Sequence, residues 1–86
     1  MHDQAQATIA MALPPRPRWV TERVWRRFMA VEVEQRSLAA VAREEAVTRG
    51  AVAQSVKKAR AAIRAVRRSE RLPPIAFPSV VVARSD

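Results

Sequence analysis

The sequence contains no cysteine, one histidine and one glycine. The lack of cysteine excludes disulfides, thiolate zinc sites and cysteine nucleophiles together. His2 has no nearby metal-ligating partner, and a single glycine cannot build a glycine-rich phosphate loop. We therefore expect no enzymatic activity, no metal site and no cofactor.

Long hydrophobic runs are also lacking. No apolar stretch approaches the ~20 residues of a membrane span, and the N-terminus lacks the basic and apolar regions of a signal peptide. These absences predict a cytoplasmic protein that does not insert into a membrane. With 86 residues, the chain can form one domain at most, and its abundant alanine favours a mainly α-helical fold.

Charge of one sign is present in excess. Sixteen lysines and arginines face eight acidic residues, which gives a net charge of +8. Such an excess favours a polyanionic partner, either nucleic acid or an anionic membrane surface.

The segment from Ser37 to Lys58 predicts two short helices joined by a tight turn. Ser37 and Thr48 are suitable N-caps, and we expect the second helix to run to about Ser69. Ala46 stands in the turn, where glycine is usual, and must turn without glycine's conformational freedom. Glu45 replaces a usual apolar residue, so we expect it at the domain edge, paired with an arginine. This arrangement predicts a helix-turn-helix motif.

The second of these helices is amphipathic. Its apolar stripe comprises Val52, Val56, Ala59, Ile63 and Val66. The opposite face carries Gly50, Gln54, Lys57, Ala61, Arg64 and Arg68, flanked by Arg49, Ala53 and Lys58, with no acid from Thr48 to Ser69. Any soluble helix can have a charged outer face, and that interpretation stays open beside the functional one.

The exposed face has residues suited to DNA recognition. Gln54 can make a bidentate contact with adenine and Arg49 with guanine. Gly50 and Ala53 are small enough to let the backbone approach base edges. The predicted base contacts are Thr48, Arg49, Gly50, Ala51, Ala53 and Gln54. The predicted phosphate contacts are Lys57, Lys58, Arg60 and Ser37.

The preceding segment, residues 19–35, predicts the first of about three helices. Thr21 is its expected N-cap, and Val24, Phe28 and Val31 form its core stripe. Trp25 and Phe28 are more typical of core than of a base-stacking platform. Arg23, Arg26 and Arg27 form a basic side that could add contacts to a DNA backbone.

The two ends of the chain differ from the helical domain at residues 19–71. Residues 1–18 are expected to form a flexible, basic, proline-rich arm, either a disordered leader or a contact to DNA. Residues 72–86 form a strand-like tail after the helix-breaking prolines. We expect the tail to dimerise the protein, through Ile75, Phe77, Val80, Val81 and Val82. Alternatively, the tail covers the domain's own surface.

Two stretches, VTRGAVAQSVKKARAAI and RLPPIAFPSVVVA, resemble the KorA/TrfB family of plasmid transcriptional repressors. The closest match is Val47 to Ile63. The resemblance implies a helical DNA-binding domain joined to a dimerisation segment that begins with a strand. It also implies regulation of plasmid maintenance or transfer operons. Because the chain stops at Asp86, it is more similar to a short, KorC-like member. The family's DNA-contact positions fall on Thr48, Arg49, Ala51, Gln54 and Lys58.

The sequence therefore predicts a bacterial, nucleoid- or plasmid-associated repressor. We expect a homodimer that binds double-stranded DNA at a palindromic promoter operator with half-sites about 34 Å apart. A co-repressor protein is a further candidate partner. The alternative is a helix-turn-helix module that docks on a larger transcription protein. The dimer would be held by the tail, by the last helix, or by both.

Overall fold

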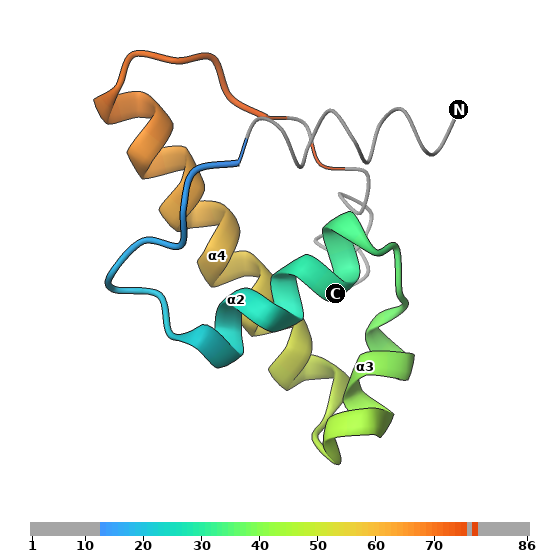
Figure 1. Ribbon diagram of the computed structural model, residues 1–86. Coiled ribbons are helices and arrows are strands. Elements are labelled where there is room, and N and C mark those ends of the chain that lie inside the picture. Colours follow the sequence, from blue (N-terminus) through green and yellow to red (C-terminus); the bar gives the residue numbers. More distant parts are fainter. Residues whose placement is uncertain (1–12, 76, 78–86) are drawn as a thin grey trace.

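A computed structural model describes residues 13–75 and residue 77, and this part of the chain is mainly helical (Figure 1). Helix α2 spans Glu22–Phe28 and continues into a π-helical segment, η1, at Met29–Val33. Helix α3 spans Leu38–Glu45, and α4 spans Arg49–Ser69. No strand occurs among these described residues. The prediction of a mainly α fold is confirmed for them.

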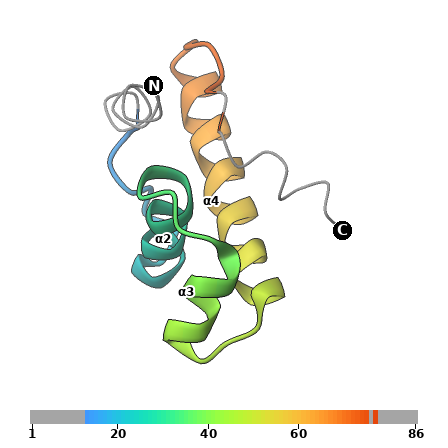
Figure 2. The same cartoon turned by 90° about the vertical axis from the view of Figure 1, so that its right-hand side faces the viewer.

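Helix α4 is the longest element, and the other helices pack along it (Figures 1 and 2). Its predicted stripe is confirmed from Val52 to Ile63, whereas Val66 is only half-buried. The stripe meets residues of α2, η1 and α3 in one core. The buried members of this core are Phe28, Ala30, Val31, Val41, Ala42, Val52, Val56, Ala59 and Ile63.

All three predicted N-caps are confirmed. The hydroxyl oxygens of Thr21, Ser37 and Thr48 each accept a hydrogen bond from the amide three residues later, at 3.2, 3.0 and 3.0 Å. Each bond satisfies an amide that lacks a partner within its helix, which stabilises a helix by about 1 kcal/mol. The starts of α2, α3 and α4 were therefore encoded locally.

The helix predicted within residues 19–35 begins directly after its expected cap, Thr21, and differs from the prediction at its other end. The residues before the cap form a turn closed by the Val20 amide and the Pro17 carbonyl, at 3.0 Å. After Phe28 the helix widens into η1, where the Glu34 amide donates to the Met29 carbonyl at 2.9 Å. The chain then leaves the helix.

The predicted flexible arm at 1–18 is corrected for its last six residues, 13–18. Leu13 packs against the core and Pro17 is buried. The Arg16 guanidinium donates to the Val20 carbonyl at 2.8 Å. Burial and this hydrogen bond make the segment part of the domain. Residues 1–12 of the predicted arm lie outside the described residues.

Two residues of the predicted dimerisation tail, Ile75 and Phe77, lie within the described part of the chain. Both side chains are half-buried against the core of their own chain. The Phe77 ring meets the Phe28 ring edge-on, with 5.5 Å between centroids, a favourable aromatic geometry. These two residues therefore cover part of their own domain, and their predicted contribution to a dimer stays a prediction. Val80, Val81 and Val82 lie outside the described residues.

The turn between α3 and α4 lies at Ala46, where the sequence predicted it, and this alanine is in the left-handed conformation. Ala46 has φ 57° and ψ 43°. Its amide donates to the Arg43 carbonyl at 3.3 Å, and the Val47 amide donates to the Ala42 carbonyl at 2.9 Å. These bonds form a Schellman motif, which normally has glycine at the left-handed position.

Ala46→Gly is therefore expected to stabilise the domain by about 0.5–1 kcal/mol, because an L-residue with a Cβ is strained at positive φ. Urea denaturation followed by circular dichroism measures the change. The control is Ala40→Gly inside α3, which should destabilise by about 1 kcal/mol. Equal losses from both substitutions would show that residue 46 carries no strain.

Candidate nucleic-acid interface

The N-cap and the first turns of α4 contain all six predicted base-contacting residues. Thr48, Arg49, Gly50 and Gln54 are exposed, and Ala51 and Ala53 are half-buried. The Thr48 hydroxyl oxygen also serves as the helix cap. The sequence therefore located an accessible surface of small, amide and cationic groups, and its contact with a ligand stays a prediction.

Gly50 has no conformational role in this surface. It lies within α4, and its φ is not positive. A Cβ added there would have as its nearest neighbour the Thr48 Oγ1, 3.9 Å away, which is ordinary contact distance. Glycine inside a helix costs about 0.5–1 kcal/mol relative to alanine. Neither the backbone conformation nor the packing of the described residues requires a glycine at position 50. A ligand that approaches the backbone closely would require one.

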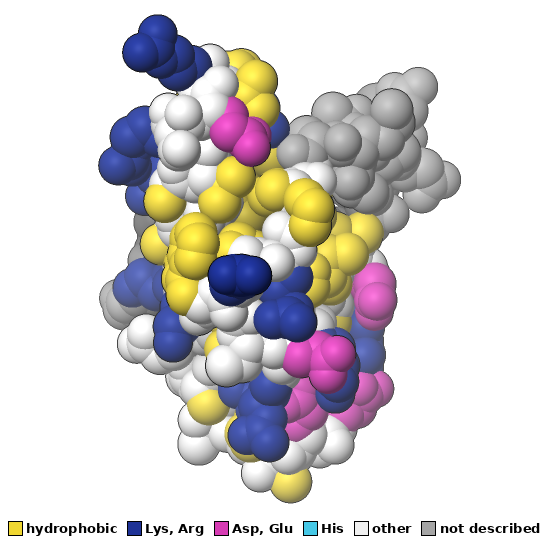
Figure 3. Space-filling view, turned by 60° about the vertical axis from the view of Figure 1, so that its left-hand side comes forward, with side chains coloured by type: hydrophobic (Ala, Val, Ile, Leu, Met, Phe, Trp, Pro, Cys, Tyr) yellow, Lys and Arg dark blue, Asp and Glu magenta, His cyan; other side chains and the backbone are white. Residues whose placement is uncertain are grey.

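A groove of about 740 Å³ extends from this surface along α4 and reaches α2. All of its ionisable lining residues are basic. The lining consists of Val24, Gln54, Ser55, Lys57, Lys58, Arg60, Ala61 and Arg64. Figure 3 shows one face of the molecule, where lysine and arginine side chains follow the left-hand edge and most acidic side chains gather at the lower right. The groove is thus suited to an anionic ligand.

Arg60 differs from the other predicted phosphate contacts. Its guanidinium is 2.6 Å from the carboxylate of Glu32, and the side chains are 12% and 0% exposed respectively. It also lies 5.6 Å from the centre of the Phe77 ring. Arg60 is therefore no longer a predicted phosphate contact, because its guanidinium is paired with the buried Glu32 carboxylate. Lys57 and Lys58 are exposed, as predicted.

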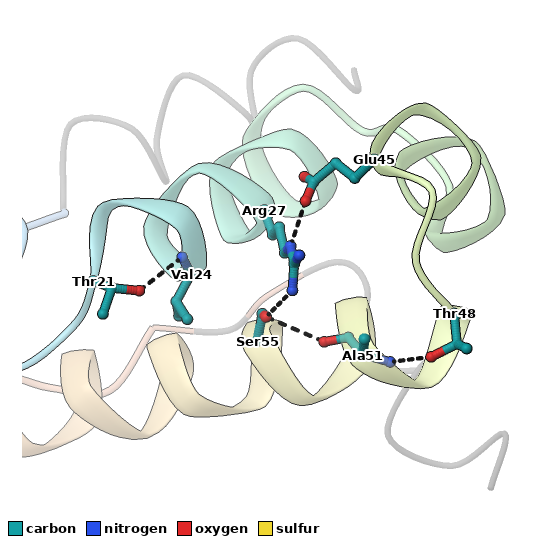
Figure 4. Close-up of polar contacts among 7 residues, drawn as sticks. All are labelled: Thr21, Val24, Arg27, Glu45, Thr48, Ala51 and Ser55. Atoms are coloured by element: carbon teal, nitrogen blue, oxygen red, sulfur yellow. Dashed lines mark hydrogen bonds and ion pairs between the residues drawn. The ribbon is translucent and has the colours of Figure 1, made fainter.

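Arg27 is a second arginine with an internal role. Its Nε donates to Glu45 Oε1 at 2.7 Å, and its Nη1 donates to Ser55 Oγ at 3.0 Å (Figure 4). Ser55 Oγ in turn donates to the Ala51 carbonyl at 3.1 Å. The expected pairing of Glu45 with an arginine is confirmed, whereas the expectation that Arg27 faces a DNA backbone is wrong. The network joins α2, the end of α3 and the start of α4.

A further ion pair spans α3. The Arg36 guanidinium donates to the Glu44 carboxylate. This hydrogen bond lowers the pKa of Glu44 below its usual value and raises the pKa of Arg36. Ser37, also predicted to contact phosphate, is exposed and caps α3 through its hydroxyl oxygen.

The described part of the chain contains no group of three or more histidine, cysteine or acidic residues placed to hold a metal ion. None of its helices combines the length and the apolar character needed to cross a membrane.

No family model, curated protein or solved structure matches this chain. The resemblance to the KorA/TrfB repressors therefore stays a prediction from the sequence.

Proposed function

We propose that this protein binds double-stranded DNA in a sequence-specific manner through a helix-turn-helix motif made of α3 and α4. The observation that carries the proposal is the exposed face of α4. No acidic residue occurs in the 21 residues of this helix. Its first turns expose Arg49, Gly50 and Gln54, which suit close contact with base edges.

The connection between the helices supports this motif. Only residues 46–48 separate α3 from α4, which is the turn length typical of helix-turn-helix proteins. The B-DNA major groove, about 12 Å wide, admits an α-helix. In this arrangement the start of α4 enters the groove, and Lys57 and Lys58 contact phosphates.

The regulatory role that fits such a domain is transcriptional repression. As a homodimer, the protein would cover a palindromic promoter operator, with half-sites about 34 Å apart, and exclude polymerase. Plasmid maintenance or transfer operons are the targets that the sequence resemblance implies. Because Ile75 and Phe77 pack on their own domain, the dimer contact would need residues after Phe77 or another surface.

Selection of bound duplexes from a random DNA pool tests the proposal. The wild-type protein should enrich a defined sequence, and a palindrome would indicate a dimer. Gln54→Ala and Arg49→Ala should each weaken binding to that sequence by about 1–3 kcal/mol and relax the preference at one base pair. Arg68→Ala, on the same face near the other end of α4, should preserve the preference. An unchanged preference in both Gln54→Ala and Arg49→Ala would place sequence recognition elsewhere.

A protein-interaction module is the second candidate, and Trp19 is the observation that favours it. Trp19 is 60% exposed, although Pro17 and Val20 on either side are buried. Tryptophan is enriched among the residues that dominate protein interfaces. If Trp19→Ala abolished binding to a transcription protein while DNA selection enriched nothing, this second function would replace the first.

A further inference from the structure

We infer that the groove between α2 and α4 has a seat for one backbone phosphate of the bound nucleic acid, centred on Ala61. This inference rests on the proposed function and extends it to a residue that carries no charge. It also gives α2, through Val24, a part in the contact with the ligand.

The seat is defined by three cations around one small side chain. Lys57, Lys58 and Arg64 lie four and three residues before and three residues after Ala61, so they are its neighbours on the helix surface. All four residues are exposed and line the same groove. Within the described residues, none of the three cations is in an ion pair. Their charges are therefore available to a ligand.

The other lining groups restrict how the seat can be filled. Val24 of α2 lines the groove with an apolar surface, so it offers a phosphate no hydrogen bond. The Ser55 hydroxyl is engaged by Arg27 and by the Ala51 carbonyl. Arg60 is paired with Glu32. A phosphate in the groove would thus be held by Lys57, Lys58 and Arg64, over a methyl group that leaves it room.

The distance along α4 matches the geometry of B-DNA. Ala61 follows Gln54 by two helical turns, or about 11 Å along the axis. The major groove is about 12 Å wide. With Gln54 at the base edges, the region around Ala61 therefore lies near the phosphates that border the groove. This spacing favours a duplex backbone over a free phosphate or a lipid headgroup.

Two matched substitutions test the seat. Ala61→Glu places a carboxylate among the three cations, whereas Ala65→Glu makes the same change of charge one turn later. Ala65 is also exposed, but it does not line the groove. We expect Ala61→Glu to weaken duplex binding at least about tenfold more than Ala65→Glu. Only at the seat would the introduced carboxylate lie next to the negatively charged DNA phosphate and repel it. Thermal melting of both variants verifies that each is folded.

The full chain is titrated against the duplex enriched by selection, a mixed-sequence duplex of equal length and phosphatidylglycerol vesicles. A larger loss with Ala61→Glu on both duplexes supports the seat. Equal affinities of the two variants for both duplexes would overturn it, even if the wild-type protein prefers the enriched sequence. If selection enriches no sequence but the variants still differ on the mixed duplex, the seat stands and sequence-specific recognition fails. A difference confined to vesicles would overturn the assignment to nucleic acid.

Discussion

Glu32→Leu is expected to lower the free energy of unfolding by about 3–5 kcal/mol, the usual cost of leaving one partner of a buried ion pair uncompensated. The Glu32 side chain is fully buried, and its partner Arg60 is 12% exposed. Leucine would leave the Arg60 guanidinium in the interior without its carboxylate. Because small domains are stable by only about 5–15 kcal/mol, the variant should show a much lower urea midpoint.

A double substitution separates the lost charge balance from lost packing. Glu32→Leu combined with Arg60→Met should recover most of the stability, since apolar residues of similar size can replace a buried pair at little cost. Glu34→Ala, at an exposed acid two residues later, should change stability by less than about 0.5 kcal/mol. A Glu32→Leu variant as stable as Glu34→Ala would contradict the structure of this pair.

Arg27→Met is expected to have the next largest effect and to lower the free energy of unfolding by about 2–3 kcal/mol. Arg27 is 9% exposed at its side chain, whereas Glu45 is 29% exposed and can regain water. The loss should therefore be smaller than at Glu32. Because the guanidinium joins the end of α3 to α4 through Glu45 and Ser55, we also expect weaker binding to the selected duplex. Denaturation and duplex titration measure the two effects.

Arg23→Met is the matched control, because Arg23 lies on the same helix but is exposed. It should leave stability within about 0.5 kcal/mol of the wild type. Arg27→Lys should be intermediate, since lysine keeps the charge but cannot reproduce the planar fork of donors. If Arg23→Met and Arg27→Met were equally stable, the network would have no structural role.

Local chemistry made much of this fold predictable. The three hydroxyl caps gave the starts of the helices, and the apolar spacing from Val52 to Ile63 gave the buried side of α4. The position of the turn at Ala46 also followed from the sequence pattern. Each of these features depends on residues within a few positions of one another.

The errors concern contacts between distant segments. Glu32 follows Phe28 by one helical turn, and Arg60 follows Val56 by one turn. Both charged residues therefore lie beside apolar core positions, and their opposite charges are the signal that could have indicated an ion pair. Charge alone nevertheless suggested a solvated surface. For the tail, the sequence left open a dimer contact and a contact with its own domain. The packing of Phe77 on Phe28 joins segments far apart in the chain, which no local pattern encodes.

The predicted surface on α4 was found where the sequence put it, because amphipathic spacing determines which side faces solvent. Arg60 was misjudged because it lies at the border between the two sides. The identity of a ligand cannot follow from periodicity, and it needs the selection and titration experiments described above.

The division of α4 into a buried side and a free side has a consequence for engineering. Arg49, Gly50 and Gln54 make no contact that the core requires, so a combinatorial library at these three positions should consist mostly of folded proteins. Substitutions at these positions would leave the stability of the domain largely unchanged. New binding preferences could therefore be screened without compensating substitutions elsewhere in the chain. The same separation would allow natural lineages to diverge in target choice while keeping one scaffold.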